Sequence, residues 1–395
     1  MTVQKIADET FYVGAEDSEI EFFENQYPLR CGVTYNSYVI DDEKICVMDS
    51  VDERCCEQWM KNLSEVLGDR KPDYLVISHL ECDHSGSVSE FLRKYPDTAV
   101  VASEKAFSML AQFADVKIAD DKKIAVKEND SIQAGSHKIS FIAAPFVHWP
   151  EVIMSFDEKT QVLYSADAFG TFDIPSTLIA RSIENAAGWK DEARRYFVNI
   201  VGKYGQMVLN LLKKIGDIDY KIIAPLHGPV LAGQLHNYSK LYRQWASSEP
   251  EEKGVLIVYS TLHGHTKTAA EKAAELIRAK NIECEVFDLA HCDLSSVVSL
   301  AFKYDRILFA APTYDGSVMP CINEFNFRLK TKNLAGRKIA LIENGSWAPQ
   351  SAQIVSSMLA EFKDLSFCQK TDSIRTRLTP ENEGGIAELI DELCE

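Results

Sequence analysis

Metal-binding side chains are concentrated in one short stretch of the sequence, HLECDH, at residues 79–84. It offers imidazoles at His79 and His84 and carboxylates at Glu81 and Asp83. The stretch begins at the end of an apolar run, DYLVISH, which is typical of a buried strand. Side chains two residues apart in an extended chain project to the same side. His79, Glu81 and Asp83 are therefore predicted to share one side, while His84 reaches a second metal position once the chain turns.

Further potential ligands follow other apolar runs that end as strands do. His148 follows FIAAPFV, Asp167 follows VLYSA and His227 follows KIIAPL. A lone histidine at a strand end is more often a hydrogen-bonded surface residue, and Asp167 could cap the next segment. The grouping of ligand types within residues 79–84 favours a two-metal site built from several strand ends. Cys82 would point to the opposite side of an extended strand, so we interpret it as a packing residue.

A second group of residues predicts a phosphate-binding loop in the later part of the chain. VYSTLHGHT passes from an apolar run through hydroxyl side chains and Gly264 into the helix-forming segment KTAAEKAAELI. Backbone N–H groups at a helix N-terminus, together with hydroxyls, stabilise an anion. The loop is neither a Walker loop nor a GxGxxG fingerprint, because the residues that define those motifs are missing. A plain helix cap at Thr266 is the alternative interpretation.

Two later loops each carry an aromatic residue that could cover a flat ring: Tyr314 in APTYDGSVMP and Trp347 in NGSWAP. Both follow apolar runs, and the order of the three loops resembles flavodoxin. The resemblance implies FMN, with phosphate contacts from Ser260, Thr261, Leu262, His263, Gly264, His265 and Thr266. It implies ring and ribityl contacts from Pro312, Thr313, Tyr314, Asp315, Gly316, Asn344, Gly345, Ser346 and Trp347. His265 stands where that family usually has Asn, and the third loop lacks the usual second glycine and aromatic residue.

The first half of the chain resembles the metallo-β-lactamase superfamily, which carries H-x-H-x-D-H where this chain has HLECDH. Glu81 replaces the second histidine of that pattern. The predicted site therefore offers three carboxylates and four imidazoles, a harder and more negative set than a zinc hydrolase usually has. Oxygen-rich ligation favours iron, so iron is the expected metal.

The H-x-E-x-D-H pattern and the fused second half together resemble the flavodiiron proteins over nearly the whole chain. The resemblance implies that His79, Glu81 and His148 hold one iron ion. It implies that Asp83, His84 and His227 hold the other. Asp167 would bridge the pair, together with an oxo or hydroxo group. In some members of that family the residue that matches His84 swings away from the metal.

The elements that position these residues change character at a polar, acidic segment containing a proline, residues 247–253. Before it, apolar runs paired around turns predict a strand-rich half. Helical periodicity in that half is found at 53–67, 87–95, 193–215 and 235–246. After it, fully apolar strands alternate with helices, which predicts a parallel, doubly wound sheet. We predict an α/β chain with an αββα metallo-β-lactamase-like sandwich over residues 1–250 and a flavodoxin-like domain over residues 254–395.

Composition excludes several classes of partner. The 395 residues include 42 basic and 59 acidic side chains, a net charge of −17 without any basic run. Nucleic acids and anionic membranes both need a positive surface, so neither is an expected partner. No apolar stretch approaches the length of about 18 residues that spans a membrane. The ten cysteines form no CxxC pair, which predicts reduced thiols and a cytoplasmic protein.

Joined in one chain, FMN and a di-iron centre imply an oxidoreductase that acts on a small gas. The resemblance implies reduction of dioxygen to water, of nitric oxide to nitrous oxide, or of both. Sites on two domains of one chain need not face each other, so the resemblance implies a head-to-tail homodimer or a dimer of such dimers. No rubredoxin or flavin-reductase module follows in the sequence. Electrons are therefore expected from a separate rubredoxin, or from a reduced deazaflavin cofactor.

Two other functions compete with this interpretation. A di-zinc hydrolase of thioesters or lactams could carry the flavodoxin-like domain for regulation, although Glu81 argues against it. A pure electron carrier could have a degenerate first domain, although every ligand type is present. Cys31 and Trp149 are candidates to line the metal pocket, Cys31 because many family members have a histidine at its place. The alternatives are a buried thiol for Cys31 and an ordinary core aromatic residue for Trp149.

Overall fold

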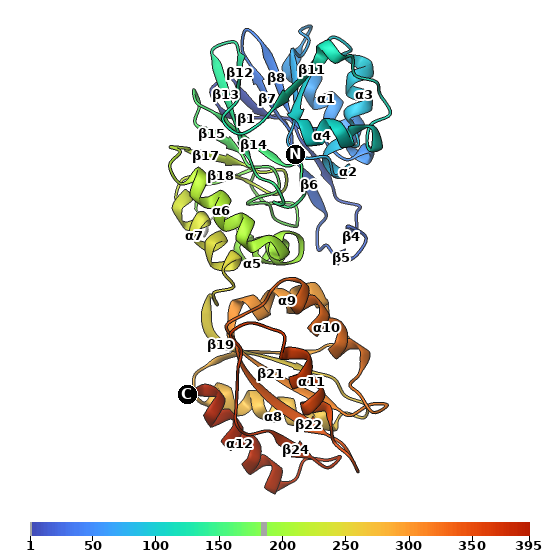
Figure 1. The fold of residues 1–395 in the computed structure, drawn as a ribbon, viewed down its shortest axis with the longest axis vertical. Coiled ribbons are helices and arrows are strands. Elements are labelled where there is room, and N and C mark those ends of the chain that lie inside the picture. Colours follow the sequence, from blue (N-terminus) through green and yellow to red (C-terminus); the bar gives the residue numbers. More distant parts are fainter. Residues whose placement is uncertain (1, 183–187) are drawn as a thin grey trace. The chain divides into compact units, whose positions relative to one another are not determined.

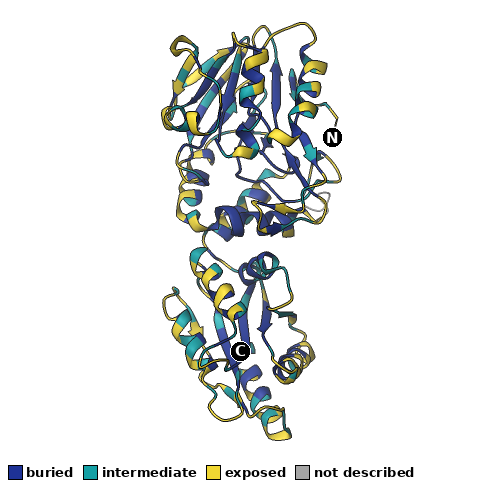
Figure 2. Cartoon of the chain, turned by 90° about the vertical axis from the view of Figure 1, so that its right-hand side faces the viewer, coloured by how far each residue is buried: buried dark blue, intermediate teal, exposed yellow. Residues whose placement is uncertain are grey.

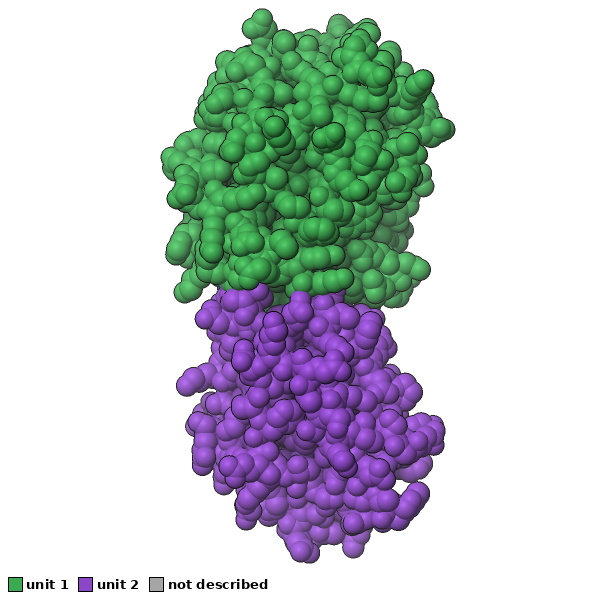
Figure 3. Space-filling view, viewed as in Figure 1, with its two compact units in different colours: residues 1–243 green, residues 244–395 purple. Residues whose placement is uncertain are grey.

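The computed structural model describes residues 2–182 and 188–395, and it divides into two compact units (Figures 1 and 3). Unit 1 spans Met1–Arg243 and unit 2 spans Gln244–Glu395. The division falls within helix α7 (Leu235–Ala246). Among the described residues, no helix has the length and apolar character needed to cross a membrane.

Within its described residues, unit 1 contains two seven-stranded sheets and two short antiparallel pairs. The first sheet has the order β1 (Gln4–Ala7), β2 (Thr10–Tyr12), β7 (Tyr38–Asp41), β8 (Ile45–Met48), β9 (Tyr74–Ile77), β10 (Ala99–Ser103) and β11 (Lys123–Val126). The second has the order β12 (Ser131–Ala134), β13 (His137–Ala143), β14 (Ile153–Asp157), β15 (Val162–Tyr164), β17 (Ile222–Ala224), β18 (Val230–Ala232) and β16 (Ile179–Ala180). The short pairs are β3 (Ala15–Asp17) with β6 (Val33–Tyr35), and β4 (Phe22–Phe23) with β5 (Tyr27–Pro28).

The core of unit 1 lies between the two sheets. Tyr38 and Met48 of the first sheet belong to the same buried cluster as Phe141 and Tyr164 of the second. Figure 2 shows the strands of the unit as largely buried, with exposed residues on loops and outer helix faces. This is the sandwich predicted for the first half, because alternate side chains of each strand face the opposite sheet.

Helices follow the strands along unit 1. They are α1 (Cys56–Leu67), the single turn α2 (Cys82–Ser85), α3 (Val88–Lys94), α4 (Glu104–Met109), α5 (Trp189–Tyr196), α6 (Gly205–Ile215) and α7. Helices α1 and α4 contact strands of the first sheet. Helix α6 buries Val208, Leu211, Leu212 and Ile215, the spacing of one apolar helix face.

The predicted helix over residues 193–215 is interrupted in the structure. A π-helical segment (Phe197–Val201) and a 3-10 turn (Gly202–Tyr204) separate α5 from α6. The amide of Asn199 donates to the carbonyl oxygen of Arg195 at 2.8 Å, and such side-chain bonds compete with helical ones. The glycine that begins the 3-10 turn also has poor helix propensity.

Unit 2 is a parallel sheet covered by helices. Its order is β20 (Glu283–Asp288), β19 (Glu252–Tyr259), β21 (Tyr304–Pro312), β22 (Lys338–Asn344) and β23 (Ser366–Phe367), and β24 (Asp372–Ile374) also pairs with β22. All of these pairings are parallel. The helices are α8 (His265–Ala279), α9 (Leu294–Lys303), α10 (Pro320–Thr331), α11 (Ser351–Leu359) and α12 (Pro380–Cys394). Helix α8 packs against α12 and α9 packs against α10, so the predicted doubly wound fold is confirmed.

Candidate metal centre and flavin pocket

The seven metal-binding side chains predicted from the sequence lie together at one end of the unit 1 sandwich. His79 follows β9 of the first sheet. His148 lies between β13 and β14, Asp167 follows β15 and His227 follows β17, all of the second sheet. The site is therefore built from loops of both sheets and not from the edge of a single sheet.

The extended conformation predicted for residues 79–83 ends at Glu81. Glu81 is the residue before helical turn α2, with φ −55° and ψ 146°, and Asp83 and His84 lie within the turn. This turn carries Asp83 and His84 away from His79 and Glu81 and into a second group. Cys82 is exposed, so the interpretation of it as a packing residue was wrong, because that interpretation assumed an extended chain.

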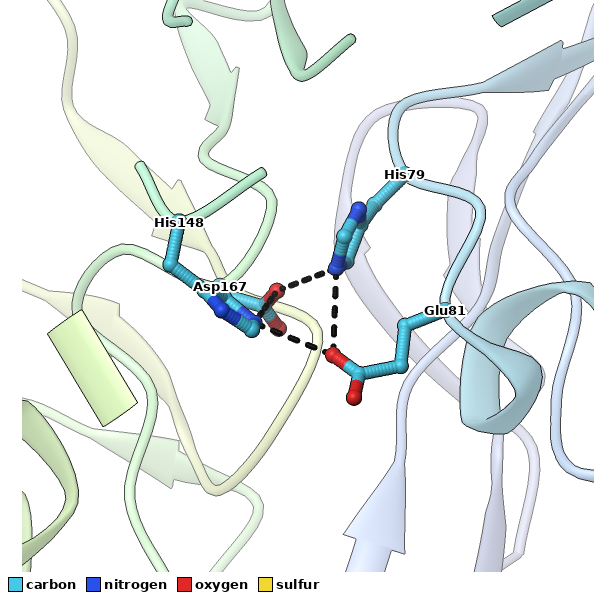
Figure 4. A group of neighbouring side chains, drawn as sticks. All are labelled: His79, Glu81, His148 and Asp167. Atoms are coloured by element: carbon cyan, nitrogen blue, oxygen red, sulfur yellow. Dashed lines mark hydrogen bonds and ion pairs between the residues drawn. The ribbon is translucent and has the colours of Figure 1, made fainter. Parts of the chain in front are cut away.

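The first group consists of His79, Glu81, His148 and Asp167 (Figure 4). Nε2 of His79 lies 3.3 Å from Oε2 of Glu81 and 3.3 Å from Oδ2 of Asp167. Nε2 of His148 lies 3.0 Å from the same Glu81 oxygen and 3.4 Å from the same Asp167 oxygen. Two imidazole nitrogens and two carboxylate oxygens therefore converge on one point.

The second group consists of Asp83, His84 and His227. Oδ2 of Asp83 lies 3.3 Å from Nε2 of His84 and 3.2 Å from Nε2 of His227. Oδ1 of Asp167 faces the same two nitrogens, at 3.2 and 3.5 Å. Asp167 thus directs one carboxylate oxygen to each group, which is the arrangement of a bridging ligand.

Six polar atoms of this site are buried without a hydrogen-bond partner among the described residues. Both oxygens of Asp83 and of Asp167, and Nε2 of His84 and His227, have no hydrogen-bond partner among the described residues. Buried polar atoms in proteins normally have such partners. Unpartnered nitrogen and oxygen atoms that converge in two groups fit a pair of metal ions.

The electrostatics of the site favour bound cations. Burial raises the pKa of Asp167, but the imidazoles of His79 and His84 outweigh it and hold that pKa well below its ordinary value. Burial lowers the pKa of His148, but the carboxylates of Asp167 and Glu81 outweigh it and raise that pKa to about 9. The carboxylates therefore remain ionised and attract positive charge, whether on protons or on metal ions.

Two of the imidazoles are held from behind. Nδ1 of His79 donates to Oε1 of Glu151 at 2.7 Å, and Nδ1 of His227 donates to the carbonyl oxygen of Thr34 at 2.7 Å. Gly228 has φ +76°, and a Cβ atom there would lie 2.1 Å from Cγ2 of Thr171, so only glycine fits beside His227. These contacts fix which nitrogen of each ring faces the site.

A cavity of about 610 Å³ opens onto the carboxylates Glu81 and Asp83. Its lining residues are Glu19, Ile20, Glu21, Phe22, Phe23, Glu24, Asn25, Tyr35, Asp52, Arg54, Glu81, Cys82 and Asp83. Trp149 packs its ring edge-on to His79 at 5.1 Å, beside the metal groups. Cys31 is exposed and lines a different cavity with Arg30 and Asp173, so it is not the buried thiol considered as the alternative.

In unit 2, the predicted flavin residues surround a cavity of about 400 Å³ at the carboxyl ends of β19, β21 and β22. The predicted residues that line it are Thr261, Leu262, His263, His265, Thr266, Pro312, Thr313, Tyr314, Asp315, Gly316, Asn344, Gly345, Ser346 and Trp347. Ser260 and Gly264 lie in the same loop but not in the lining. Tyr314 and Trp347 are 39% and 87% exposed, so both aromatic faces are free to cover a ring.

The loop before α8 suits a phosphate group. Gly264 precedes the helix with φ 87°. No side chain caps α8, so the first backbone N–H groups of the helix have no side-chain acceptor. Thr266 lies inside α8, so it is not the simple cap considered as the alternative. The hydroxyl of Ser260 is buried without a hydrogen-bond partner among the described residues. Free N–H groups and an unpartnered hydroxyl fit an anion here.

Sequence reasoning missed three residues of the flavin cavity, Ala348, Gln350 and Thr376. Thr376 follows β24, a three-residue strand beyond the single last strand expected at residues 365–369. The sequence around β24 contains one apolar residue, Ile374, and this pattern is too weak to predict a strand. Glu151 was also missed, although it lies three residues after His148 in the sequence.

Comparisons with known proteins match both units. A model described as ODP family beta lactamase matches residues 33–228, and a flavodoxin domain model matches residues 256–375. The chain is 29% identical to a nitric oxide reductase from Moorella thermoacetica, over 80% of this chain and 79% of that protein. It is 30% identical to putative diflavin flavoprotein A 2 from Nostoc over 78% of its length, but spans only 53% of that longer protein.

The fold also matches a solved structure. The rubredoxin oxygen:oxidoreductase from Desulfovibrio gigas superposes with a TM-score of 0.90, covering 100% of this chain and 98% of that one. The sequence identity is 22%, so this likeness concerns the fold. Both units of the chain are present in that structure, in the same order.

Proposed function

The chain belongs to the flavodiiron proteins, and from this premise we propose that it is an oxidoreductase that reduces dioxygen to water, nitric oxide to nitrous oxide, or both. FMN and two iron ions are its cofactors. The iron ions would be held by the two side-chain groups of unit 1, and FMN by the cavity of unit 2. When bound, FMN takes up electrons in pairs and releases them singly, and the iron ions bind and reduce the gas.

The observation that carries this proposal is the position of Glu81 beside the bridging Asp167. One Glu81 oxygen lies 3.3 and 3.0 Å from Nε2 of His79 and His148, where a zinc hydrolase of this fold would offer a third imidazole. With Asp83 and Asp167, the site contains three carboxylates, which suits iron. No comparable observation favours the di-zinc hydrolase.

The protein's own residues have defined tasks in this function. Glu151 and Thr34 orient His79 and His227, so that Nε2 of each ring points into the site. The carboxylates would balance the charge of the ions, and the cavity opens to solvent at Glu81 and Asp83. Trp149 packs edge-on against the His79 ring and supports its position.

We propose a separate rubredoxin as the electron donor. The solved relative from Desulfovibrio gigas is named a rubredoxin oxygen:oxidoreductase, which supports a donor of that type. A reduced deazaflavin cofactor is the alternative. Mixing the reduced candidates with the oxidised protein and following the flavin absorbance would distinguish them by rate.

A head-to-tail homodimer, or a dimer of such dimers, would bring the flavin of one copy to the metal centre of another. Charge supports this pairing. The metal cavity has an acidic rim that includes exposed Glu19, Glu21 and Glu24. Exposed Arg375 and Arg377 flank Thr376, which lines the flavin cavity. A negative metal cavity on one copy and a positive flavin cavity on another would attract each other, which favours association of the two copies in that orientation.

We also place the protein in the cytoplasm. All ten cysteines are free in the structure, and a reducing compartment keeps thiols in that state.

The proposed function is tested by loading the full-length protein with iron and FMN, reducing it without oxygen, and following dioxygen and nitric oxide consumption in parallel. We expect consumption of at least one gas, with about two iron ions per chain. Two zinc ions and no iron after growth with iron would favour the hydrolase. Bound flavin that cycles without any gas consumption would favour the electron carrier.

A further inference from the structure

Glu151 is a buried carboxylate directly behind the metal centre. It lies in the connection from β13 to β14, and its side chain is 0% exposed. Its Oε1 atom accepts from Nδ1 of His79 at 2.7 Å and from the backbone N–H of Leu80 at 3.0 Å. Its backbone carbonyl accepts from the hydroxyl of Ser103 at 2.8 Å. Glu151 is therefore held at both its backbone and its side chain.

The two bonds to Oε1 determine the tautomer of His79. The backbone N–H of Leu80 can only donate, so Oε1 acts as an acceptor. With Glu151 as a carboxylate, Oε1 has no proton to donate, so Nδ1 of His79 is the protonated nitrogen and Nε2 presents its lone pair to the site. That Nε2 atom lies 3.3 Å from both Glu81 and Asp167, at the centre of the first group.

The two imidazoles of the second group lack such a partner. Nδ1 of His227 meets a neutral carbonyl oxygen, that of Thr34, at 2.7 Å. Nδ1 of His84 is buried and has no hydrogen-bond partner among the described residues. Of these three imidazoles, only that of His79 has a carboxylate at its Nδ1 atom, which faces away from the site. The two metal groups have similar ligand types, but they differ in the hydrogen-bond partners of their imidazoles on the side away from the site.

We propose that Glu151 is a positioning residue that makes the two metal positions unequal. Its carboxylate fixes the His79 ring and increases the basicity of Nε2, so the position bound by His79, Glu81 and His148 is the more electron-donating one. The metal ion there is held more tightly and is harder to reduce than its neighbour. This inference rests on the proposed di-iron function, and it adds a residue outside the ligand set and an order to the two ions.

The test compares Glu151→Gln, Glu151→Asp and Glu151→Ala in the full chain loaded with iron-57 and FMN. Glutamine keeps the shape and the two acceptor bonds but removes the charge. Aspartate keeps the charge on a shorter side chain. Alanine removes both, and it is included only if its melting temperature matches that of the wild type. Glu158→Gln, a change at an exposed carboxylate that bonds Ser140, is the matched control.

We expect Glu151→Gln to weaken binding of one iron ion by about 10–100-fold, the usual cost of losing such a partner. Mössbauer spectra should show one altered and one unchanged iron signal, and redox titration should show easier reduction of the altered ion. FMN content should not change, and Glu151→Asp should restore part of the iron affinity. Glu158→Gln should match the wild type.

Equal change of both iron signals in Glu151→Gln, or wild-type affinity and spectra in that variant, would overturn the inference while leaving the proposed function intact. A wild-type protein that binds no iron would instead overturn the proposed function itself. Iron binding lost to the same extent in Glu151→Asp and Glu151→Gln, with normal melting temperatures, would also contradict a role for the charge.

Discussion

Nε2 of His84 lies 3.2 Å from Oδ1 of Asp167, yet neither ring nitrogen of this buried imidazole makes a hydrogen bond within the described chain. His227, on the other side of the same group, is anchored by the carbonyl oxygen of Thr34. His84 therefore has its position set by the site that it faces, whereas His227 is placed in advance by the fold. The two ligands of one metal position differ in how far they are preorganised.

This difference predicts that His84→Ala loses less iron affinity than His227→Ala. Ordering a free side chain costs about 0.5–1.5 kcal/mol, so the loss at His84 should be about 2–10-fold smaller. Iron binding to each apoprotein, followed by absorbance with a competing chelator, measures the ratio. Equal losses would show that the bond from His227 to Thr34 contributes nothing to preorganisation.

Removal of the bridge should affect both ions together. Asp167 directs Oδ2 to His79 and Oδ1 to His84, so Asp167→Ala takes a ligand from each position. We expect both ions to be lost in parallel, with FMN retained in unit 2. Metal analysis and flavin absorbance of the purified variant provide the two readouts. Asp69→Ala, at an exposed position, is the control, and loss of a single ion from Asp167→Ala would contradict the bridging role.

Glu81→His restores the imidazole of the zinc-type pattern H-x-H-x-D-H. The change replaces a carboxylate oxygen that lies 3.0 Å from Nε2 of His148. Because imidazole suits zinc and carboxylate suits iron, the zinc-to-iron ratio should rise in cells grown with both metals. Glu81→Gln removes the charge without adding an imidazole and should lower total metal instead. An unchanged ratio in Glu81→His would mean that Glu81 does not select the metal.

Flavin binding should depend on the unpartnered hydroxyl of Ser260. It is buried at the end of β19, just before the loop that precedes α8. A hydrogen bond to a charged group contributes about 1.5–3 kcal/mol, so Ser260→Ala should weaken FMN binding by about 10–100-fold. Quenching of FMN fluorescence measures this affinity, and iron content should remain normal. Ser357→Ala, on an exposed face of α11, should leave both cofactors unchanged.

Local sequence patterns predicted much of this fold. They also identified candidate site residues that the structure places together. His79, His148, Asp167 and His227 each come just after an apolar run, and such runs mark strand ends. His148, Asp167 and His227 could therefore be chosen one by one, although their roles as metal ligands remain predictions. Most residues that line the flavin cavity were predicted in the same way, from the loops that follow β19, β21 and β22.

The remaining features depend on contacts that no local pattern records. The single turn α2 is too short to show helical periodicity, so strand alternation alone grouped Asp83 with His79, and only the family resemblance assigned Asp83 to the second group. Glu151 bonds a histidine 72 residues away, and Thr34 bonds one 193 residues away. Such pairs form only when segments distant in the sequence pack together, so tertiary structure alone reveals them.

His137 lies outside the metal centre, and its sequence context predicted no role for it. Its contacts in the structure predict a pH dependence of stability. Its side chain is fully buried at the start of β13, with Nδ1 2.7 Å from Asp157 and Nε2 2.9 Å from Glu9. Lys159 also contacts Glu9. Burial lowers the pKa of His137, but the two carboxylates outweigh it and raise that pKa above its ordinary value.

A pKa that is higher in the folded than in the unfolded state means that the folded protein holds the proton more tightly. The stabilisation by protonated His137 is therefore fully present below about pH 6.5 and is lost as the pH rises through the folded-state pKa. His137→Gln lacks this contribution. The difference in unfolding free energy between wild type and His137→Gln should shrink from pH 6 to pH 9.

Urea unfolding of unit 1, within the iron-loaded full chain, measures this difference at each pH, and subtraction cancels groups that titrate alike in both proteins. His236→Gln changes an exposed histidine and should show no such trend. Asp157→Asn removes the closer carboxylate, so it should lower the folded-state pKa of His137 and shift the loss of stability to lower pH. A difference that stays constant between pH 6 and pH 9 would mean that folding does not raise the pKa of His137.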